Sequence, residues 1–312
     1  MLDSIYGAIE LGLMYALMAL GVYITFRILD FPDLTVDGSF ATGAAIAAVM
    51  ITHGYHPLIA TLAAFGGGLL AGVCTGLLHT KGKINGLLSG ILMMIALYSI
   101  NLRITGKPNT SLIGESTIFS SVASTTWLYI VVLLAVAVAF MLLLNAFLHT
   151  DLGLALRATG DNDRMIRSFG ANTDRTKIIG IALSNGLVAL SGAMIAQDGG
   201  YANNSMGIGM IVIGLASVII GEAIFGAKNV VRATLAALLG SIVYRIVIAL
   251  ALRADWLHLN ASDLKLITAI IVIIALVIPT ARRALKQRSL ARKRSVELAA
   301  EVMGRRGGQV DA

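Results

Sequence analysis

Long apolar stretches recur along this chain, and they constrain its fold more than any other feature. Each is close to the ~20 residues that an α-helix needs to cross a hydrocarbon core about 30 Å thick. The stretches are continuously apolar rather than alternating, which disfavours a transmembrane β-barrel. Only 13% of the 312 residues are charged, about half the fraction typical of a soluble domain. The sequence therefore predicts an all-α fold, a polytopic transmembrane helical bundle.

The number of membrane spans depends on one ambiguous segment. Segment 34–52 has two carboxylates at its start, Asp33 and Asp37, so it either crosses the membrane or dips in and returns. A crossing would place the N-terminus outside, and a re-entrant segment would place it inside. We expect about 8–10 spans, drawn from the segments 8–28, 34–52, 57–79, 84–105, 127–148, 177–197, 207–227, 230–252 and 264–281.

Positive charge near the C-terminus sets the expected orientation. Residues 282–312 contain nine Lys or Arg against three Asp or Glu, and cytoplasmic segments of membrane proteins carry such an excess. We therefore predict a transmembrane domain over 1–282 and a basic cytoplasmic tail over 283–312. Contact with anionic membrane lipid explains the tail better than nucleic-acid binding. Counting spans backward from the tail places the polar segment 149–176 in the cytoplasm.

The polar segment 149–176 is too long and too patterned for a simple connector. Asp161 or Asn162 can cap the start of a short helix, and Gly170 can end it. Such a helix on the water side of a membrane protein suggests docking onto a partner. Its small apolar face and the charged residues at its rim would be Met165, Ile166, Phe169, Arg164 and Arg167.

Signatures of catalysis are missing from the sequence. The five histidines show neither HExxH nor other metal-ligand spacing, and there is no G-x-S-x-G nucleophile motif. The phosphate-binding pattern GxxxxGK[ST] is also missing. We therefore predict that the chain is not an enzyme, binds no metal or cofactor, and does not itself hydrolyse ATP.

Polar residues inside apolar segments are the candidates for a translocation path, because burying them in lipid costs a few kcal/mol. Helix capping is an alternative role for Asp33 and Thr35. Glu222 lies about 15 Å in depth from Arg245 on the next segment, which argues against an ion pair between them. The candidate path residues are Asp33, Thr35, Asp37, Ser39, Asn185 and Glu222.

Small residues at a spacing of four predict close helix packing. One such face comprises Gly68, Gly72 and Gly76, and another comprises Ala233, Ala237 and Ser241. These faces are common in membrane proteins, so they indicate a tight bundle and no particular function.

The polar segment and the stretches around it resemble a known family. Residues 157–170 and 183–193 are similar to permease subunits of bacterial ABC importers for branched-chain amino acids, sugars and nucleosides. Residues 31–40 and 206–222 resemble the subgroup described as tryptophan/tyrosine-type uptake permeases. In the family, an A-x-G-x-N pattern followed by a short helix and a glycine marks the loop that docks on the ATPase. The matching positions here are Ala158, Gly160, Asn162 and Gly170.

The resemblance implies an ATP-driven import system in the bacterial inner membrane. The expected partners are an ABC ATPase subunit, an extracytoplasmic substrate-binding protein, and a second permease copy or a paralogue. The cargo would be a small nutrient, an amino acid by the subgroup label, selected largely by the external binding protein. The alternative is a secondary transporter driven by an ion gradient, with Asp33, Asp37 or Glu222 as ion sites.

Overall fold

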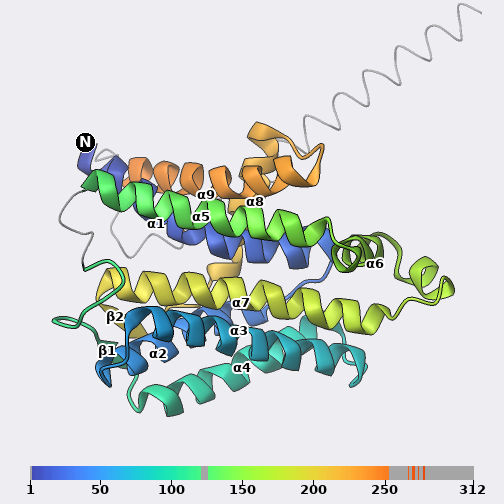
Figure 1. Cartoon of the computed structure of the whole chain (residues 1–312), viewed down its shortest axis with the longest axis horizontal. Coiled ribbons are helices and arrows are strands. Elements are labelled where there is room, and N and C mark those ends of the chain that lie inside the picture. Colours follow the sequence, from blue (N-terminus) through green and yellow to red (C-terminus); the bar gives the residue numbers. More distant parts are fainter. Residues whose placement is uncertain are drawn as a thin grey trace, which may run out of the picture. The chain divides into compact units, whose positions relative to one another are not determined.

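Helices make up nearly all of the chain that the computed structural model describes, namely residues 2–120 and 126–252 with isolated positions between 266 and 277. The basic tail 283–312 and most of segment 264–281 lie outside these residues. Figure 1 shows the arrangement. The helices are α1 (Leu2–Val22), η1 (Tyr23–Ile28, a π-helical continuation of α1), α2 (Thr35–Thr52), α3 (Pro57–Thr80), α4 (Gly86–Thr105), α5 (Thr126–Leu148), α6 (Asp151–Ser168), α7 (Thr173–Gly199), α8 (Met210–Phe225) and α9 (Val230–Leu252).

The structure confirms the predicted all-helical membrane bundle. Within the described part, seven helices are long and apolar enough to cross a membrane. The ambiguous segment 34–52 forms one unbroken helix of 18 residues, α2, and belongs to these seven. Segment 207–227, expected as a full span, is shorter: α8 has 16 residues. It begins only at Met210 because the chain before it, from Asn204 to Gly209, is a series of turns.

A small sheet that the sequence did not predict joins two connections. Strands β1 (Asn109–Ser111) and β2 (Tyr201–Asn203) pair in antiparallel fashion. They tie the α4–α5 connection to the α7–α8 connection, at the end of the bundle opposite α6 (Figure 1). Strands of three residues are too short to leave a sequence pattern, so only the tertiary arrangement reveals them.

Helix α7 lies at the centre and packs against α1, α2 and α3. The predicted glycine face of α3 makes this possible. A Cβ added to Gly72 would lie 2.5 Å from the carbonyl oxygen of Ile181, and one added to Gly76 would lie 2.9 Å from the Cα of Ile178. Only glycine fits at such distances, which confirms the prediction of close packing there.

Helix α1 is covered on one side by α9. The second predicted small-residue face lies in this contact: Ala237 is fully buried, and the Ser241 hydroxyl donates to the carbonyl oxygen of Gly12 at 2.8 Å. A Cβ on Gly12 would lie 2.7 Å from the Cα of Ile242. Close contact between the two backbones therefore also holds α9 against α1.

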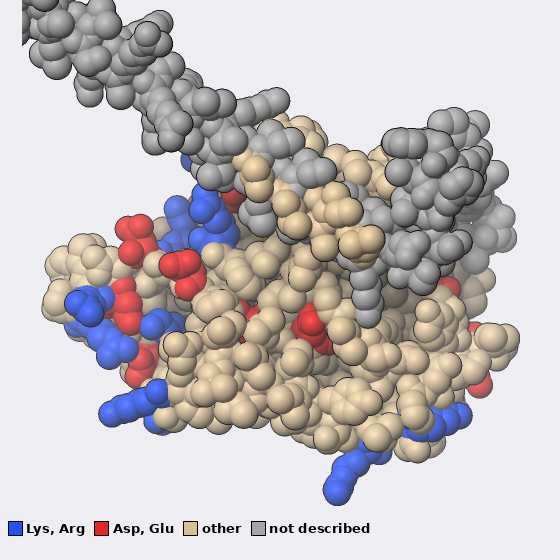
Figure 2. Space-filling view, turned by 180° about the vertical axis from the view of Figure 1, so that it is seen from behind, with Lys and Arg blue, Asp and Glu red and all other residues tan. Residues whose placement is uncertain are grey.

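Charge is distributed unevenly over the surface. Figure 2 shows Lys, Arg, Asp and Glu gathered mainly at one end of the molecule, with a broad, nearly uncharged area beside them. An apolar belt of this kind suits a hydrocarbon environment, and the charged end suits water. Helix α6, with residues of both signs, projects from the end of the bundle that carries the junction with α7 (Figure 1).

Candidate functional site

Helix α6 fills most of the segment that was expected to be a polar loop. It begins at Asp151, where the Thr150 side chain accepts a hydrogen bond from the backbone N–H of Gly153. The helix is interrupted at Asn162, whose backbone is extended (φ −155°, ψ 90°). The helical part is thus longer than predicted, because a first half over 151–161 precedes the expected short helix.

The second half of α6 matches the predicted short helix. The Asn162 side-chain oxygen accepts from the backbone N–H of Met165 at 3.0 Å, so Asn162 is the cap. The chain leaves the helix at Gly170, whose φ of +84° is the left-handed conformation that glycine adopts without strain. Asp161 lies before the break and is exposed.

The tip of α6 presents apolar side chains to the outside. Phe169 is 77% exposed and Met165 is 50% exposed, whereas Ile166 is partly buried. Arg164 is exposed beside them. Large apolar side chains that lie exposed next to one another on a polar helix are typical of a surface that a partner covers.

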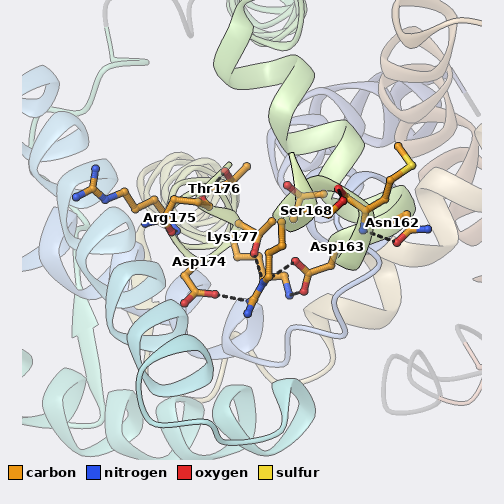
Figure 3. Close-up of polar contacts among 12 residues, drawn as sticks. Asn162, Asp163, Ser168, Asp174, Arg175, Thr176 and Lys177 are labelled. Carbon is orange, nitrogen blue, oxygen red and sulfur yellow. Dashed lines mark hydrogen bonds and ion pairs between the residues drawn. The ribbon is translucent and has the colours of Figure 1, made fainter. Parts of the chain in front are cut away.

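Ion pairs hold this tip to the start of α7 (Figure 3). The Lys177 ammonium donates to an oxygen of Asp163 at 2.8 Å. The Arg167 guanidinium donates to Asp174 at 2.8 Å and to the Thr173 hydroxyl at 2.8 Å. Arg167, expected at the rim of the docking face, therefore also braces the junction. These ion pairs connect the tip of α6 to the start of α7.

The charge of Asp163 is stabilised by these contacts. Partial burial by itself would raise the pKa of Asp163. The hydrogen bond from Lys177 and the charges of Lys177 and Arg167 outweigh burial and hold the pKa below its ordinary value. The Asp163 carboxylate is therefore charged at neutral pH.

The first half of α6 rests on the end of the first span. A Cβ added to Gly160 would overlap the carbonyl oxygen of Ile28, so the two backbones touch at that point. Leu156, one turn earlier, is 1% exposed, and Ala158 is partly buried. The matched A-x-G-x-N glycine thus serves a packing contact with η1.

The same π-helical segment is bonded to α8. The Arg27 guanidinium donates to a Glu222 carboxylate oxygen at 2.9 Å. A polar cavity of about 870 Å³ adjoins this pair and is lined by residues of η1, α6 and the α8–α9 turn, among them Arg157, Gly160 and Lys228. Helix α6, the end of the first span and α8 therefore meet at one place.

Four of the six candidate path residues form a closed network in the interior. The Asn185 side-chain nitrogen donates to Asp33 at 2.7 Å, and its oxygen accepts from the Ser39 hydroxyl at 2.7 Å. The other Asp33 oxygen accepts from the backbone N–H of Thr35 at 2.9 Å. The Thr35 hydroxyl pairs with that of Thr75 at 2.8 Å. All five residues have no exposed surface, so the network joins α2, α3 and α7.

Asp37 has a different role from its neighbours. Its two carboxylate oxygens accept from the backbone N–H groups of Gly209 and Ile211, each at 2.8 Å. These are unpaired donors at the start of α8, and a carboxylate there also interacts favourably with the helix dipole. Asp37 therefore fixes where α8 begins, within the bundle, and remains only partly buried.

Several partners of these residues were not predicted. Glu222 pairs with Arg27, which lies 195 residues earlier in the chain. The predicted difference in depth had argued against a pair between Glu222 and Arg245. Arg245 instead lies 3.8 Å from the centre of the Tyr15 ring. Thr75 and Lys177 carried no sequence signal, because contacts between distant helices follow no local spacing. The charge of Arg27 inside an apolar segment is the sequence feature that could have indicated its pairing with another charged residue.

Comparison with known proteins identifies the family of this chain. Residues 4–277 match the family described as branched-chain amino acid transport system / permease component. The chain is 43% identical over 274 residues to a tyrosine transport system permease protein of Clostridioides difficile (strain R20291), covering 87% of this chain and 90% of that protein. It is also 27% identical to the ribose import permease protein RbsC of Escherichia coli K12, over 60% of this chain and 59% of that protein.

Two solved structures share the fold. One is PsaBC from Streptococcus pneumoniae in complex with Fab (TM-score 0.52, 13% identity, 91% of this chain and 94% of that chain). The other is an inward-facing conformation of a putative metal-chelate type ABC transporter (TM-score 0.50, 18% identity, 90% and 85%). The family match spans most of the sequence, so this chain belongs to the permease components of branched-chain amino acid type ABC transport systems.

Proposed function

We propose that the chain forms the translocation path of an importer that takes up an amino acid such as tyrosine across the bacterial inner membrane. As an ABC permease component it works with a separate ATPase. The name of the 43% identical relative supports the cargo class. The basic tail supports a cytoplasmic C-terminus. Family membership favours ATP-driven transport over the ion-gradient alternative.

Helix α6 is the element that docks on the ATPase. The single observation that carries this assignment is the exposed pair Phe169 and Met165 at the tip of a braced polar helix. Aromatic and methionine side chains are enriched in the cores of protein interfaces. Ile166 completes the apolar face, and Arg164 supplies a charged rim.

The packing suggests a route by which movement of the ATPase reaches the membrane. Gly160 contacts Ile28, so a displacement of α6 pushes on η1. Arg27 in η1 is bonded to Glu222 in α8, so the push continues to the helix whose start Asp37 fixes. Such coupling requires contacts that differ between the two states of the transporter. Glu222 would then belong to the cytoplasmic gate.

The remaining path candidates receive two roles in this proposal. Asp33, Thr35, Ser39 and Asn185 hold together the helices that form the wall of the path, since their polar atoms are occupied by one another. Asp37 lies nearer to the path. A second permease copy or a paralogue completes the path, and an external binding protein delivers the cargo.

Replacing the docking residues tests the assignment directly. In the double variant Met165→Asp/Phe169→Asp, two carboxylates stand where an apolar face would be buried, and burying an unpaired charge is costly. We expect the cognate ATPase to stop co-purifying with the permease and uptake to be lost. Affinity purification of the tagged permease from membranes, with quantification of the ATPase, measures the effect.

Ile113→Asp is the matched control, because Ile113 is 87% exposed and lies beyond β1, at the other end of the bundle. This variant should retain the ATPase. A double variant that keeps a full complement of ATPase would show that α6 is not the docking element.

A further inference from the structure

A second cavity lies near α2 and is separate from the polar network. Its volume is about 320 Å³, and it is lined by α2, α4 and the turns that precede α8. The lining residues from α4 come from its C-terminal half, and Asn204 follows β2, so the cavity lies toward the end opposite α6. Its walls are mainly apolar, with contributions from Met94, Ile95 and Ile208.

Two asparagines of this cavity each have one unpaired oxygen. The Asn204 side-chain nitrogen donates to the carbonyl oxygen of Tyr98 at 3.0 Å, and that of Asn101 donates to the carbonyl oxygen of Gly38 at 3.5 Å. These carbonyls fix the orientation of both amides, because a flipped amide would set two acceptors against each other. Among the described residues, neither Oδ1 has a hydrogen-bond partner, and both atoms are buried.

The two amides border the cavity from different elements, Asn101 from α4 and Asn204 from the turn that follows β2. The carbonyl oxygen that accepts from Asn204 belongs to Tyr98, in the helical turn of α4 that precedes Asn101. Asn101 is 1% exposed. Asp37 lines the same cavity, and its carboxylate keeps spare acceptor capacity beyond its two bonds to the start of α8.

A site with these properties needs hydrogen-bond donors from elsewhere. An unpaired buried acceptor costs about 1–3 kcal/mol, and lipid tails offer no donor to compensate it. A surplus of acceptors beside a carboxylate favours a positively charged group with several N–H donors. The apolar walls favour a hydrocarbon or aromatic body attached to that group.

We propose that this cavity is a cargo subsite for the protonated amino group of an amphipathic amino acid, with Asn101 and Asn204 as the amine-binding residues. The inference rests on the proposed function and adds a site and a recognised group to it. The apolar side chain of the cargo lies against Met94, Ile95 and Ile208. Both oxygens are buried, so binding requires the two amide side chains to turn toward the cargo.

Thiol labelling inside the cavity tests the proposal. Ser99 lines the cavity and is exposed, and Cys74 is the only native cysteine. In the assembled transporter carrying Cys74→Ala and Ser99→Cys, the rate of labelling by a water-soluble maleimide reports access. L-tyrosine at about ten times its Kd should slow labelling about tenfold, because the empty fraction falls as 1/(1 + [L]/Kd).

Analogues identify the recognised group. Tyramine keeps the amine and lacks the carboxylate, and it should protect the thiol. The acid 3-(4-hydroxyphenyl)propionate lacks the amine and should give no protection. Asn101→Leu and Asn204→Leu should each abolish protection by tyramine without slowing the labelling of the empty cavity. Asn85→Ser is the control, because Asn85 caps the other end of α4 with its oxygen already paired.

Each outcome bears on a different claim. Protection by the propionate equal to that by tyramine, or unchanged protection in both leucine variants, overturns the amine subsite. A thiol that does not label in the assembled transporter shows the cavity to be covered by a neighbouring subunit, which also overturns it. ATPase co-purification is measured on the same sample, so failure of the proposed function is recognised separately from failure of the subsite.

Discussion

Two polar clusters lie around the first turns of α2 and differ in how completely their hydrogen bonds are satisfied. In the network of Asp33, Ser39 and Asn185, the side-chain oxygens and the amide nitrogen are used within the cluster. In the cavity beside Asp37, the oxygens of Asn101 and Asn204 have no partner among the described residues. A saturated network holds helices together, whereas an unsaturated one can accept a ligand. Polarity at membrane depth is therefore not by itself evidence for a transport site.

The largest expected effect on stability comes from the saturated network. Both carboxylate oxygens of Asp33 accept hydrogen bonds, and Asp33→Asn replaces one of these oxygens by an N–H₂ group. This group is a donor and faces the donor from which the oxygen had accepted. Opposing two donors in a buried site should lower the free energy of unfolding by about 3 kcal/mol. Thermal unfolding in detergent micelles measures the change. The same substitution at the exposed Asp30 should leave the midpoint unchanged; equal midpoints for both variants would contradict a structural role for the network.

An intermediate effect is expected at Asp37, which caps α8 and lines the cavity. Asp37→Ala removes the acceptor for two backbone N–H groups at the start of α8 and should cost about 1–2 kcal/mol. Transport should fall further than this loss of stability explains, since Asp37 also lines the cavity. Uptake assays normalised to folded protein measure that difference. Asp37→Asn, which keeps one acceptor, should recover part of the stability and little of the uptake; full recovery of uptake would assign Asp37 to capping alone.

The smallest effect on stability is expected in the unsaturated cluster. Asn101→Leu removes a buried acceptor that has no partner and a long 3.5 Å hydrogen bond. The free energy of unfolding should therefore change by less than about 1 kcal/mol. Uptake of cargo should nevertheless fall, with KM rising more than kcat changes. Thermal unfolding and uptake kinetics on one preparation test both. A loss of stability as large as that of Asp33→Asn would remove the distinction between the two clusters.

Much of the local architecture followed from the sequence. The apolar runs predicted the helices, and of the two predicted cap residues, Asp161 and Asn162, the structure selects Asn162, while the predicted end at Gly170 was correct. The glycine face Gly68, Gly72 and Gly76 was correctly predicted to pack closely. These features depend on residues within a few positions of one another, which is why the sequence shows them directly.

The candidate site was less predictable. The sequence grouped Asp33, Asp37, Ser39 and Asn185 by polarity, but the structure separates Asp37, which caps α8, from the others, which bond to one another. The length of α8 was overestimated, because the chain before Met210 is apolar but is folded into turns. Hydropathy measures preference for a low-dielectric environment and does not distinguish a helix from turns that other helices cover.

The sequence by itself determined that the chain is a helical membrane protein, that a short capped polar helix ends at Gly170, and that the chain lacks the phosphate-binding motif of an ATPase. The physical reason is that apolar length, helix caps and nucleotide motifs are local patterns. Only the tertiary structure decided which polar groups are paired. Arg27 meets Glu222 from 195 residues away, and Asn101 and Asn204 come from separate elements. Hydrogen bonds between helices depend on how the helices pack, and that packing decides which polar groups hold the bundle together and which remain able to bind cargo.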